Sequence, residues 1–356
     1  MVISTTSEKL EVFDEPVFDN SVLSLHEHTY KPYGSPSYRN SDEVRIQVHF
    51  QDLMLDVADS YIYIEGKFTS SDPTKTCYLA NNALAFLFEE IRYEMGGEQV
   101  AYLMGFAEDY TRGVLNVKQE LIFTIARSFK NCYVGEVNAN IEINKIEWKV
   151  RHIVPEDKQK LKLLSRLNKG NSKAYVKMAY RMWDLYELPT LRETSSDVWA
   201  IKTSNSLERP RYIIVGFQNT THSDNIAMDA TKFIDADVNN IRLYLNSVVF
   251  PYERWNLDFS KKLYSAAYYA YENFQKSFYG KDMSEPLMDF GGFLNNPLFV
   301  IDCSHQADAL KSSTVDIKLE FETRKNKFPP NTKVLHSHYT TPLNVSLNYT
   351  LCRFKI

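Results

Sequence analysis

The sequence predicts an all-β chain that folds as two antiparallel β-sandwiches of about eight short strands each, with a few inserted helices. Roughly fourteen to sixteen segments alternate apolar and polar residues, and turn residues separate them at the spacing of sandwich strands. Tyrosine and phenylalanine are abundant, at 23 and 21 residues against 12 glycines, and aromatic residues favour strands. A similar strand-and-turn unit also occurs once in each half of the chain.

The repeated unit is clearest in Leu79–Val100, where an Asn-Asn pair precedes a strand that alternates through Ile91 and ends at two glycines. Strand alternation followed by a two-glycine turn is typical of a hairpin. A weaker copy, Val238–Asn246, again places Asn-Asn before an alternating run that contains Ile241. The repeat predicts a chain built twice from one architecture, with Ile91 and Ile241 at equivalent positions within a residue or two.

The remaining elements follow from hydrophobic periodicity and turn residues. Residues 1–40 are polar and carry several acids, which indicates an extended arm. Helices are expected at 103–115, 155–167 and 260–279, the last with aromatic residues at helical spacing before Gly280. Strands are expected at 44–50, 60–68, 91–95, 121–125, 141–150, 174–185, 198–203, 211–218, 239–246, 298–302, 315–321, 334–338 and 345–354.

A domain boundary is predicted in the segment 187–196, which has a proline, several small polar residues and no apolar periodicity. This places a first sandwich at 41–188 and a second at 189–356. Eight strands per half is the number found in a jelly roll, so the predicted fold is a double jelly roll.

Composition restricts the classes of function. A formal net charge of −4 argues against a molecule that binds nucleic acid or an anionic membrane with its whole surface. The four cysteines show no C-x-x-C spacing and are expected to be buried thiols of an intracellular protein. The N-terminus lacks the pattern of a signal peptide, and no apolar run has the length of a membrane span.

Motifs for catalysis are absent, since no phosphate-cradling glycine loop, nucleophile elbow or zinc-protease motif occurs. Two H-x-H pairs, His26 with His28 and His336 with His338, could each offer two metal ligands from one strand face. The alternative is that they are polar strand residues near a sheet edge. Cys303 and His305 place a thiol near an imidazole, but a buried cysteine at a strand end explains this pattern better. No catalytic, cofactor-binding or metal residue is therefore predicted.

Two further features carry open alternatives. One is an aromatic stripe on the last predicted helix, which could stack a ligand but is more typical of core or interface packing. Its members are Tyr264, Tyr268, Tyr271, Phe274 and Phe278. The other is a basic segment that could face nucleic acid or form solvated helix faces and subunit contacts. Its members are Lys149, Arg151, Lys158, Lys160, Lys162, Arg166, Lys169, Lys173 and Lys177.

Several stretches in a fixed order carry a resemblance to a known family. They lie at residues 24–32, 81–100, 208–218, 243–253 and 299–306. Together they resemble the double jelly-roll proteins of Polinton/Maverick-type elements and adintovirus-like DNA viruses, which also occur in invertebrate genomes. The resemblance spans about residues 24–355.

This resemblance implies a major capsid protein of a virion, made inside the host cell. Members of the family form homotrimers with a pseudo-hexagonal outline, which contact one another and tile an icosahedral shell. The implied partners are further copies of the chain and minor capsid or penton proteins. The family has no catalytic residues to transfer and implies no cofactor. The chain is shorter than many viral members, so its outer loops are expected to be small.

Two other hypotheses stay open at the level of sequence. The first is a two-domain β-sandwich binding module that recognises carbohydrate or protein without catalysis. The second is an enzyme on a jelly-roll scaffold, such as a cupin-type metal oxygenase, which needs a third histidine and an acid beside an H-x-H pair. The oligomeric state separates the capsid subunit from both alternatives.

Overall fold

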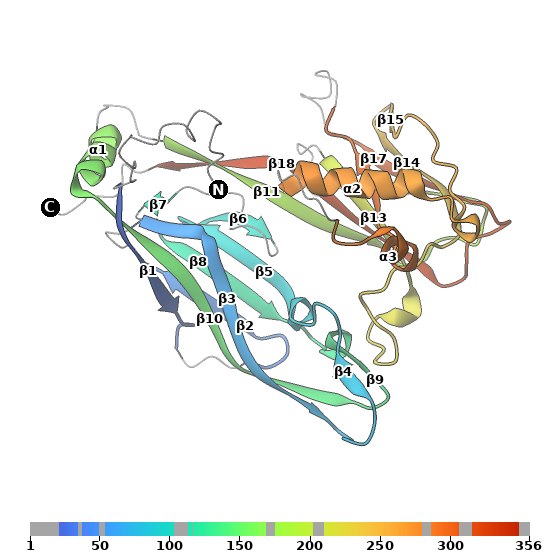
Figure 1. The fold of residues 1–356 in the computed structure, drawn as a ribbon, viewed down its shortest axis with the longest axis horizontal. Coiled ribbons are helices and arrows are strands. Elements are labelled where there is room, and N and C mark those ends of the chain that lie inside the picture. The colour runs from blue at the N-terminus through green and yellow to red at the C-terminus, as the bar shows by residue number, and fades with distance from the viewer. Residues whose placement is uncertain are drawn as a thin grey trace, which may run out of the picture.

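The computed structural model describes residues 21–34, 38–49, 54–102, 113–115, 117–168, 175–201, 210–279, 286–305 and 315–348. These residues form two β-sandwiches, one in blue to green and one in yellow to red in Figure 1. Each sandwich encloses its own cluster of buried apolar side chains. The predicted all-β double jelly-roll fold is confirmed.

The first sandwich pairs a sheet of order β1-β10-β3-β7 with a sheet of order β2-β8-β5-β6, and β4 and β9 form a separate two-stranded sheet. The bounds are β1 Val22–Tyr30, β2 Glu43–Val48, β3 Met54–Ser70, β4 Cys77–Leu79, β5 Phe88–Met95, β6 Glu98–Tyr102, β7 Val114–Leu115, β8 Gln119–Ile125, β9 Tyr133–Gly135 and β10 Ala139–Pro155.

The second sandwich pairs a sheet of order β11-β18-β13-β16 with a sheet of order β12-β17-β14-β15. The bounds are β11 Tyr175–Leu188, β12 Ser196–Ile201, β13 Pro210–Asn219, β14 Val238–Leu245, β15 Val248–Phe250, β16 Phe299–Asp302, β17 Ile317–Thr323 and β18 Thr332–Asn348. When the β4–β9 pair is set aside, both sandwiches have the same order: first, eighth, third and sixth strands in one sheet, and second, seventh, fourth and fifth in the other.

The repeated sequence unit occupies the same place in both sandwiches. Ile91 lies in the fourth strand of the first sandwich and pairs with Phe123 of the seventh. Ile241 lies in the fourth strand of the second and pairs with Phe321 of the seventh. In each case a two-residue turn leads into the fifth strand. The predicted equivalence of Ile91 and Ile241 is confirmed by strand order and register.

Alternation along these strands builds the two cores. Along β14, the residues at every second position from Ile241 are buried, because side chains of a strand point to opposite faces in turn. The first core centres on Trp148, whose indole meets the Tyr93 ring edge-on at 6.1 Å. In the second core, Phe217 contacts the rings of Phe299 and Phe321. Each sandwich therefore has aromatic side chains at the centre of its core.

Helices lie outside the sheets. The α-helices are α1 Asp157–Asn168, α2 Ser265–Tyr279 and α3 Phe290–Asn295, and the 3₁₀ turns are η1 Ala85–Leu87, η3 Lys130–Cys132, η4 Thr220–His222 and η5 Phe259–Lys261. α2 packs against β16, and Asp289 caps α3 by accepting the Gly292 N–H at 2.6 Å. The helices predicted at 155–167 and 260–279 are confirmed.

Three predictions need correction. The predicted arm 1–40 contains strand β1, which pairs with β10 along Val22–Tyr30; residues 1–20 lie outside the described residues. The helix predicted at 103–115 ends in strand β7, and its first ten residues lie outside the described part. The range 41–188 assigns β11 to the first half, whereas β11 pairs with β18 of the second sandwich. The polar segment at 187–196 is the turn between β11 and β12, because turn composition marks any loop and not only a domain boundary.

A close approach of the backbone makes Gly66 sensitive to substitution. A Cβ at this position would lie 2.5 Å from the carbonyl oxygen of Glu142, next to the irregularity in the β3–β10 pairing. Gly66→Ala is expected to lower the free energy of unfolding by about 1–3 kcal/mol, because the strands must separate to relieve the clash. Urea unfolding would measure this loss, and Thr69→Ala on the same strand serves as the control. Equal stability of the two variants would contradict the prediction.

Candidate functional site

A cleft lies where the two sandwiches meet. Loop residues of the second sandwich bind the first: the Gly135 N–H donates to the Ile226 carbonyl at 2.8 Å, and the Asp224 N–H donates to Asn131 Oδ1 at 2.8 Å. Ile226 also packs against the core of the first sandwich. We call the space beside these contacts the inter-sandwich cleft. It has a volume of about 490 Å³ and is lined by Asn81, Asn82, Ala85, Phe86, Asn131, Gln218, Ser223, Ala230, Thr231, Lys232, Phe233, Asn296, Leu298, Lys333 and Leu335.

No pattern in the sequence predicts this cleft. Its lining comes from the turn before η1, from η1, η3, β13 and β18, and from the loops that follow β13 and α3. These segments are far apart along the chain. None of these segments carries a motif with known spacing. The asparagine pair at 81–82 was noticed only as the start of a repeated strand unit, and its position in the cleft could not be inferred from that pattern.

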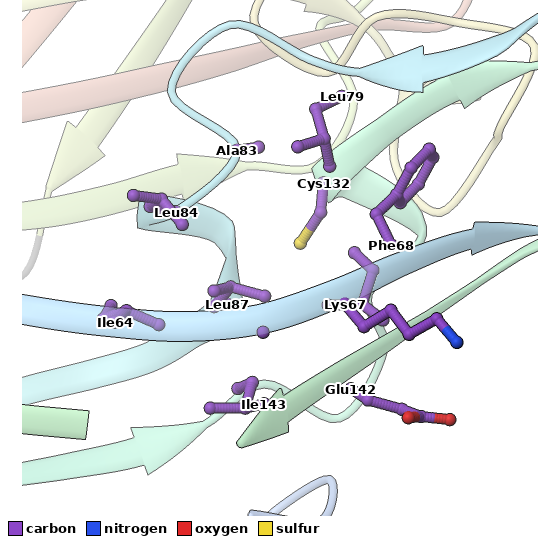
Figure 2. A pocket seen from close by; sticks show the side chains of 12 residues that line it. Ile64, Lys67, Phe68, Leu79, Ala83, Leu84, Leu87, Cys132, Glu142 and Ile143 are labelled. Atoms are coloured by element: carbon purple, nitrogen blue, oxygen red, sulfur yellow. The ribbon is translucent and has the colours of Figure 1, made fainter. Parts of the chain in front are cut away.

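A second space lies at one end of the first sandwich, between η1 and the β3–β10 pair. It has a volume of about 220 Å³ and a mostly apolar lining that includes Leu87, Ile143 and Cys132. Figure 2 shows the charged ends of Lys67 and Glu142 on one side of this pocket, pointing away from Cys132. Burial raises the pKa of the Cys132 thiol to about 12. The pocket therefore offers apolar contact and no reactive thiolate.

The first H-x-H pair lies on one strand face, as predicted, and meets a third histidine. His26 pairs with His152 across the β1–β10 ladder, and the rings of His28 and His152 lie 4.0 Å apart. Tyr30 Oη and His152 Nε2 are joined by a hydrogen bond of 2.8 Å. His152 is fully buried, and burial, followed by the charges of His28 and His26, lowers its pKa to about 4. The cluster thus holds a neutral imidazole at neutral pH.

The second H-x-H pair lies in β18. His336 is fully buried, with the rings of Tyr186 and Trp199 each 5.9 Å from its own. For His338 only the backbone is described, and it pairs with Ile213. Within the described part of the chain, no group of three or more histidine, cysteine or acidic side chains is arranged to hold a metal ion.

Cys303 and the aromatic stripe both contribute to packing within the second sandwich. Cys303 is fully buried directly after β16 and donates from Sγ to the Pro210 carbonyl, whereas His305 is exposed. Tyr264, Tyr271 and Phe274 are buried against the second core. The aromatic stripe is therefore core packing between α2 and the sheet, as the helical spacing favoured; the side chain of Phe278 lies outside the described residues.

The basic segment divides into two parts. On the outer face of β10, Lys149 binds Thr29 Oγ1 at 2.8 Å and Arg151 forms an ion pair with Asp59. Lys149 also lies 3.5 Å from Glu147 Oε2 on the same strand, so an opposite charge accompanies each of these two cations. On α1, Lys158, Lys160 and Lys162 are exposed. The side chains of Arg166, Lys169, Lys173 and Lys177 lie outside the described residues.

Strand β1 forms an exposed apolar edge of the first sandwich. Among the described residues it is the end strand of its sheet and pairs with β10 alone. Leu23 and Leu25 on its outer face expose 64% and 53% of their surface. An unpaired strand edge with apolar side chains is a ready site for association.

Two sandwiches with the same eight-strand jelly-roll order define a double jelly-roll protein. A family model described as "Double jelly roll-like domain" matches residues 99–337. The chain belongs to this family, which confirms the family predicted from the sequence motifs.

Solved structures share this fold at low sequence identity. The chain resembles a capsid structure of the PBCV-1 virus, with a TM-score of 0.52, 9% identity and coverage of 92% of this chain and 96% of that chain. A structure of the Sputnik virophage gives a TM-score of 0.59, 8% identity and coverage of 99% and 94%. The mavirus major capsid protein gives a TM-score of 0.50, 9% identity and coverage of 99% and 96%.

No curated protein matches the sequence. Among the described residues, no helix is long and apolar enough to cross a membrane.

Proposed function

We propose that this chain is a structural major capsid subunit that forms homotrimers of pseudo-hexagonal outline and assembles an icosahedral viral or virus-derived shell. The observation that carries the proposal is the duplicated jelly roll, with equal strand order in both sandwiches. Three copies would present six similar sandwiches around a three-fold axis, which is the outline that such a capsomer needs. The likeness to the PBCV-1, Sputnik and mavirus structures supports it.

The proposal includes a division into two domains between β10 and β11. Strand pairing supports it, because β1 to β10 pair among themselves and β11 to β18 pair among themselves. It also assigns the chain to the virion, with minor capsid or penton proteins as partners and no catalytic role. A contact of α1 with nucleic acid would depend on the exposed lysines of that helix.

The exposed edge of β1 is the surface that we assign to a second copy of the chain. Leu25 and its neighbour Leu23 would leave water on association, and the backbone edge of β1 that no described strand pairs with would gain partners. Left uncovered, the same edge would favour uncontrolled pairing. A specific subunit contact is the simplest way to remove this liability.

Light scattering coupled to size-exclusion chromatography tests the proposal. The chain is expected to elute as a trimer or a larger assembly, and electron microscopy is expected to show closed particles or pseudo-hexagonal capsomers. Leu25→Lys is expected to weaken the trimer at least about tenfold in dissociation constant, because a charge would be buried at the contact. Leu287→Lys, at a leucine that is 72% exposed in the second half, serves as the matched control.

A monomer at every protein concentration, salt concentration and pH would overturn the capsid proposal and favour the binding-module alternative. Trimers that respond equally to Leu25→Lys and Leu287→Lys would overturn the assignment of the β1 edge alone.

A further inference from the structure

The inter-sandwich cleft has the size and position of a small-molecule site. Its volume of about 490 Å³ falls within the range of such sites, roughly 300–1,000 Å³, and they occur preferentially at domain interfaces. Both sandwiches contribute to its lining, so a ligand there would touch both halves of the chain. Assembly into a capsid does not require such a cavity.

Side-chain amides in the cleft are held in fixed orientations. Asn131 Oδ1 accepts the Asp224 N–H at 2.8 Å, and Asn296 Oδ1 accepts the Phe233 N–H at 2.6 Å. With each oxygen engaged, the NH₂ groups of both asparagines remain as donors, and within the described residues neither has a hydrogen-bond partner. Two donors are thus already oriented at the wall of the cleft.

A buried glutamine adds an acceptor. Gln218 is only 4% exposed, and its Nε2 donates to the carbonyls of Ala230 at 2.8 Å and Lys232 at 3.2 Å. Its Oε1 has no donor among the described residues although the side chain lines the cleft. This oxygen therefore remains as an acceptor for a ligand hydroxyl.

Two lysines give the wall of this cleft positive charge. Lys232 and Lys333 line it and no acidic residue does, although the chain has a net charge of −4. Lys333 is 7% exposed; its Nζ donates to Ser223 Oγ at 2.6 Å and forms an ion pair with Glu187, whose Oε1 lies 3.6 Å away. An ammonium group has three donors, so Lys333 retains capacity for an anionic acceptor.

The remaining walls define the body of the ligand. Phe86, Phe233, Leu298 and Leu335 supply apolar surface. An adjoining cavity of about 320 Å³ shares Phe86 and Asn131 but carries two acids, Glu89 and Asp224, against one cation, Arg127, which pairs with Glu89. Its charge balance is therefore less favourable to an anionic group than that of the cleft. We propose that the inter-sandwich cleft binds a small acidic sugar, with its phosphate or carboxylate at Lys333 and Lys232 and its hydroxyl groups on the amides.

Isothermal titration of the full chain in its native assembly would test this site with glucose 6-phosphate, glucuronic acid, neutral glucose and inorganic phosphate. At least one acidic sugar is expected to bind about tenfold or more tightly than both glucose and inorganic phosphate, since only it uses the lysines and the amides together. Tighter binding of glucose 6-phosphate or of glucuronic acid would identify the anionic group as phosphate or carboxylate.

Lys232→Gln is the decisive variant, because Lys232 is exposed and its loss leaves the fold intact. It is expected to weaken binding of the acidic sugar about tenfold. Lys318→Gln, at an exposed lysine on the outer face of the β12-β17-β14-β15 sheet, serves as the matched control and is expected to bind like the parent chain. Lys333→Gln should weaken binding further, and its thermal midpoint would report any effect on folding.

The proposal is overturned if neither acidic sugar binds at millimolar concentration, if glucose binds as tightly as both acidic sugars, or if Lys232→Gln and Lys318→Gln behave alike. These outcomes are independent of the oligomeric state, so they leave the capsid proposal untouched.

Discussion

Phe123→Ala and Phe321→Ala are each expected to lower the free energy of unfolding by about 3–5 kcal/mol, because each removes a fully buried ring and leaves a cavity. The two rings occupy equivalent positions, opposite Ile91 and Ile241 in the seventh strands. Phe123 packs on Phe88 at 5.1 Å, and Phe321 packs on Phe217 at 5.5 Å. Similar losses at the two sites are expected from a duplicated fold.

Urea unfolding followed by circular dichroism would measure both losses. Tyr269→Ala is the control, since Tyr269 is 65% exposed on α2 and its removal is expected to change stability by less than about 0.5 kcal/mol. Each phenylalanine belongs to a different buried cluster, so each variant is expected to weaken its own sandwich first. A loss below about 1 kcal/mol at either site would show that the core does not depend on that ring.

Acidification is expected to destabilise the chain through His152. The folded state holds the pKa of this histidine at about 4, against an ordinary value of 6.5. As the pH falls through 6.5, the unfolded chain therefore binds a proton that the folded chain does not, and stability decreases until the pH reaches the folded pKa. Between pH 7.5 and pH 5 the expected loss is about 2 kcal/mol from this group alone.

The measurement compares urea unfolding at the two pH values in the parent chain and in His152→Gln, whose amide can still bond to Tyr30. The variant is expected to lose about 2 kcal/mol less than the parent chain on acidification. His305→Gln removes an exposed histidine and should keep the pH dependence of the parent. If His152→Gln and the parent chain respond equally to pH, the buried imidazole is not the cause.

Strands that alternate strongly were predicted from the sequence because burial on one face leaves a local pattern. β14 and β5 are examples. The turn after each of these strands was the second feature that identified the repeat. β1 was missed, since nearly all of its residues are exposed on both faces and no alternation marks an edge strand of this kind. Its sequence, with two histidines and a glutamate, is equally typical of an extended arm.

Local sequence patterns could not predict which distant segments pair or pack with one another. The segment at 174–185 was correctly predicted as a strand, but its pairing with β18 depends on register between residues far apart in the chain. The inter-sandwich cleft has the same origin, because its amides and lysines come together only when both sandwiches are in place. By contrast, α2 was predicted correctly because aromatic spacing on a helix reports directly on its buried face.

The pairing of the first with the eighth strand has a mechanical consequence. Val22 at the start of β1 lies opposite Pro155 at the end of β10, and Tyr175 lies opposite Asn348 in the same way. A force that pulls on the two ends of a sandwich would therefore break the hydrogen bonds between its first and eighth strands one after another. It would not load these bonds together in shear. Each sandwich should therefore yield at low force when it is pulled by its two ends.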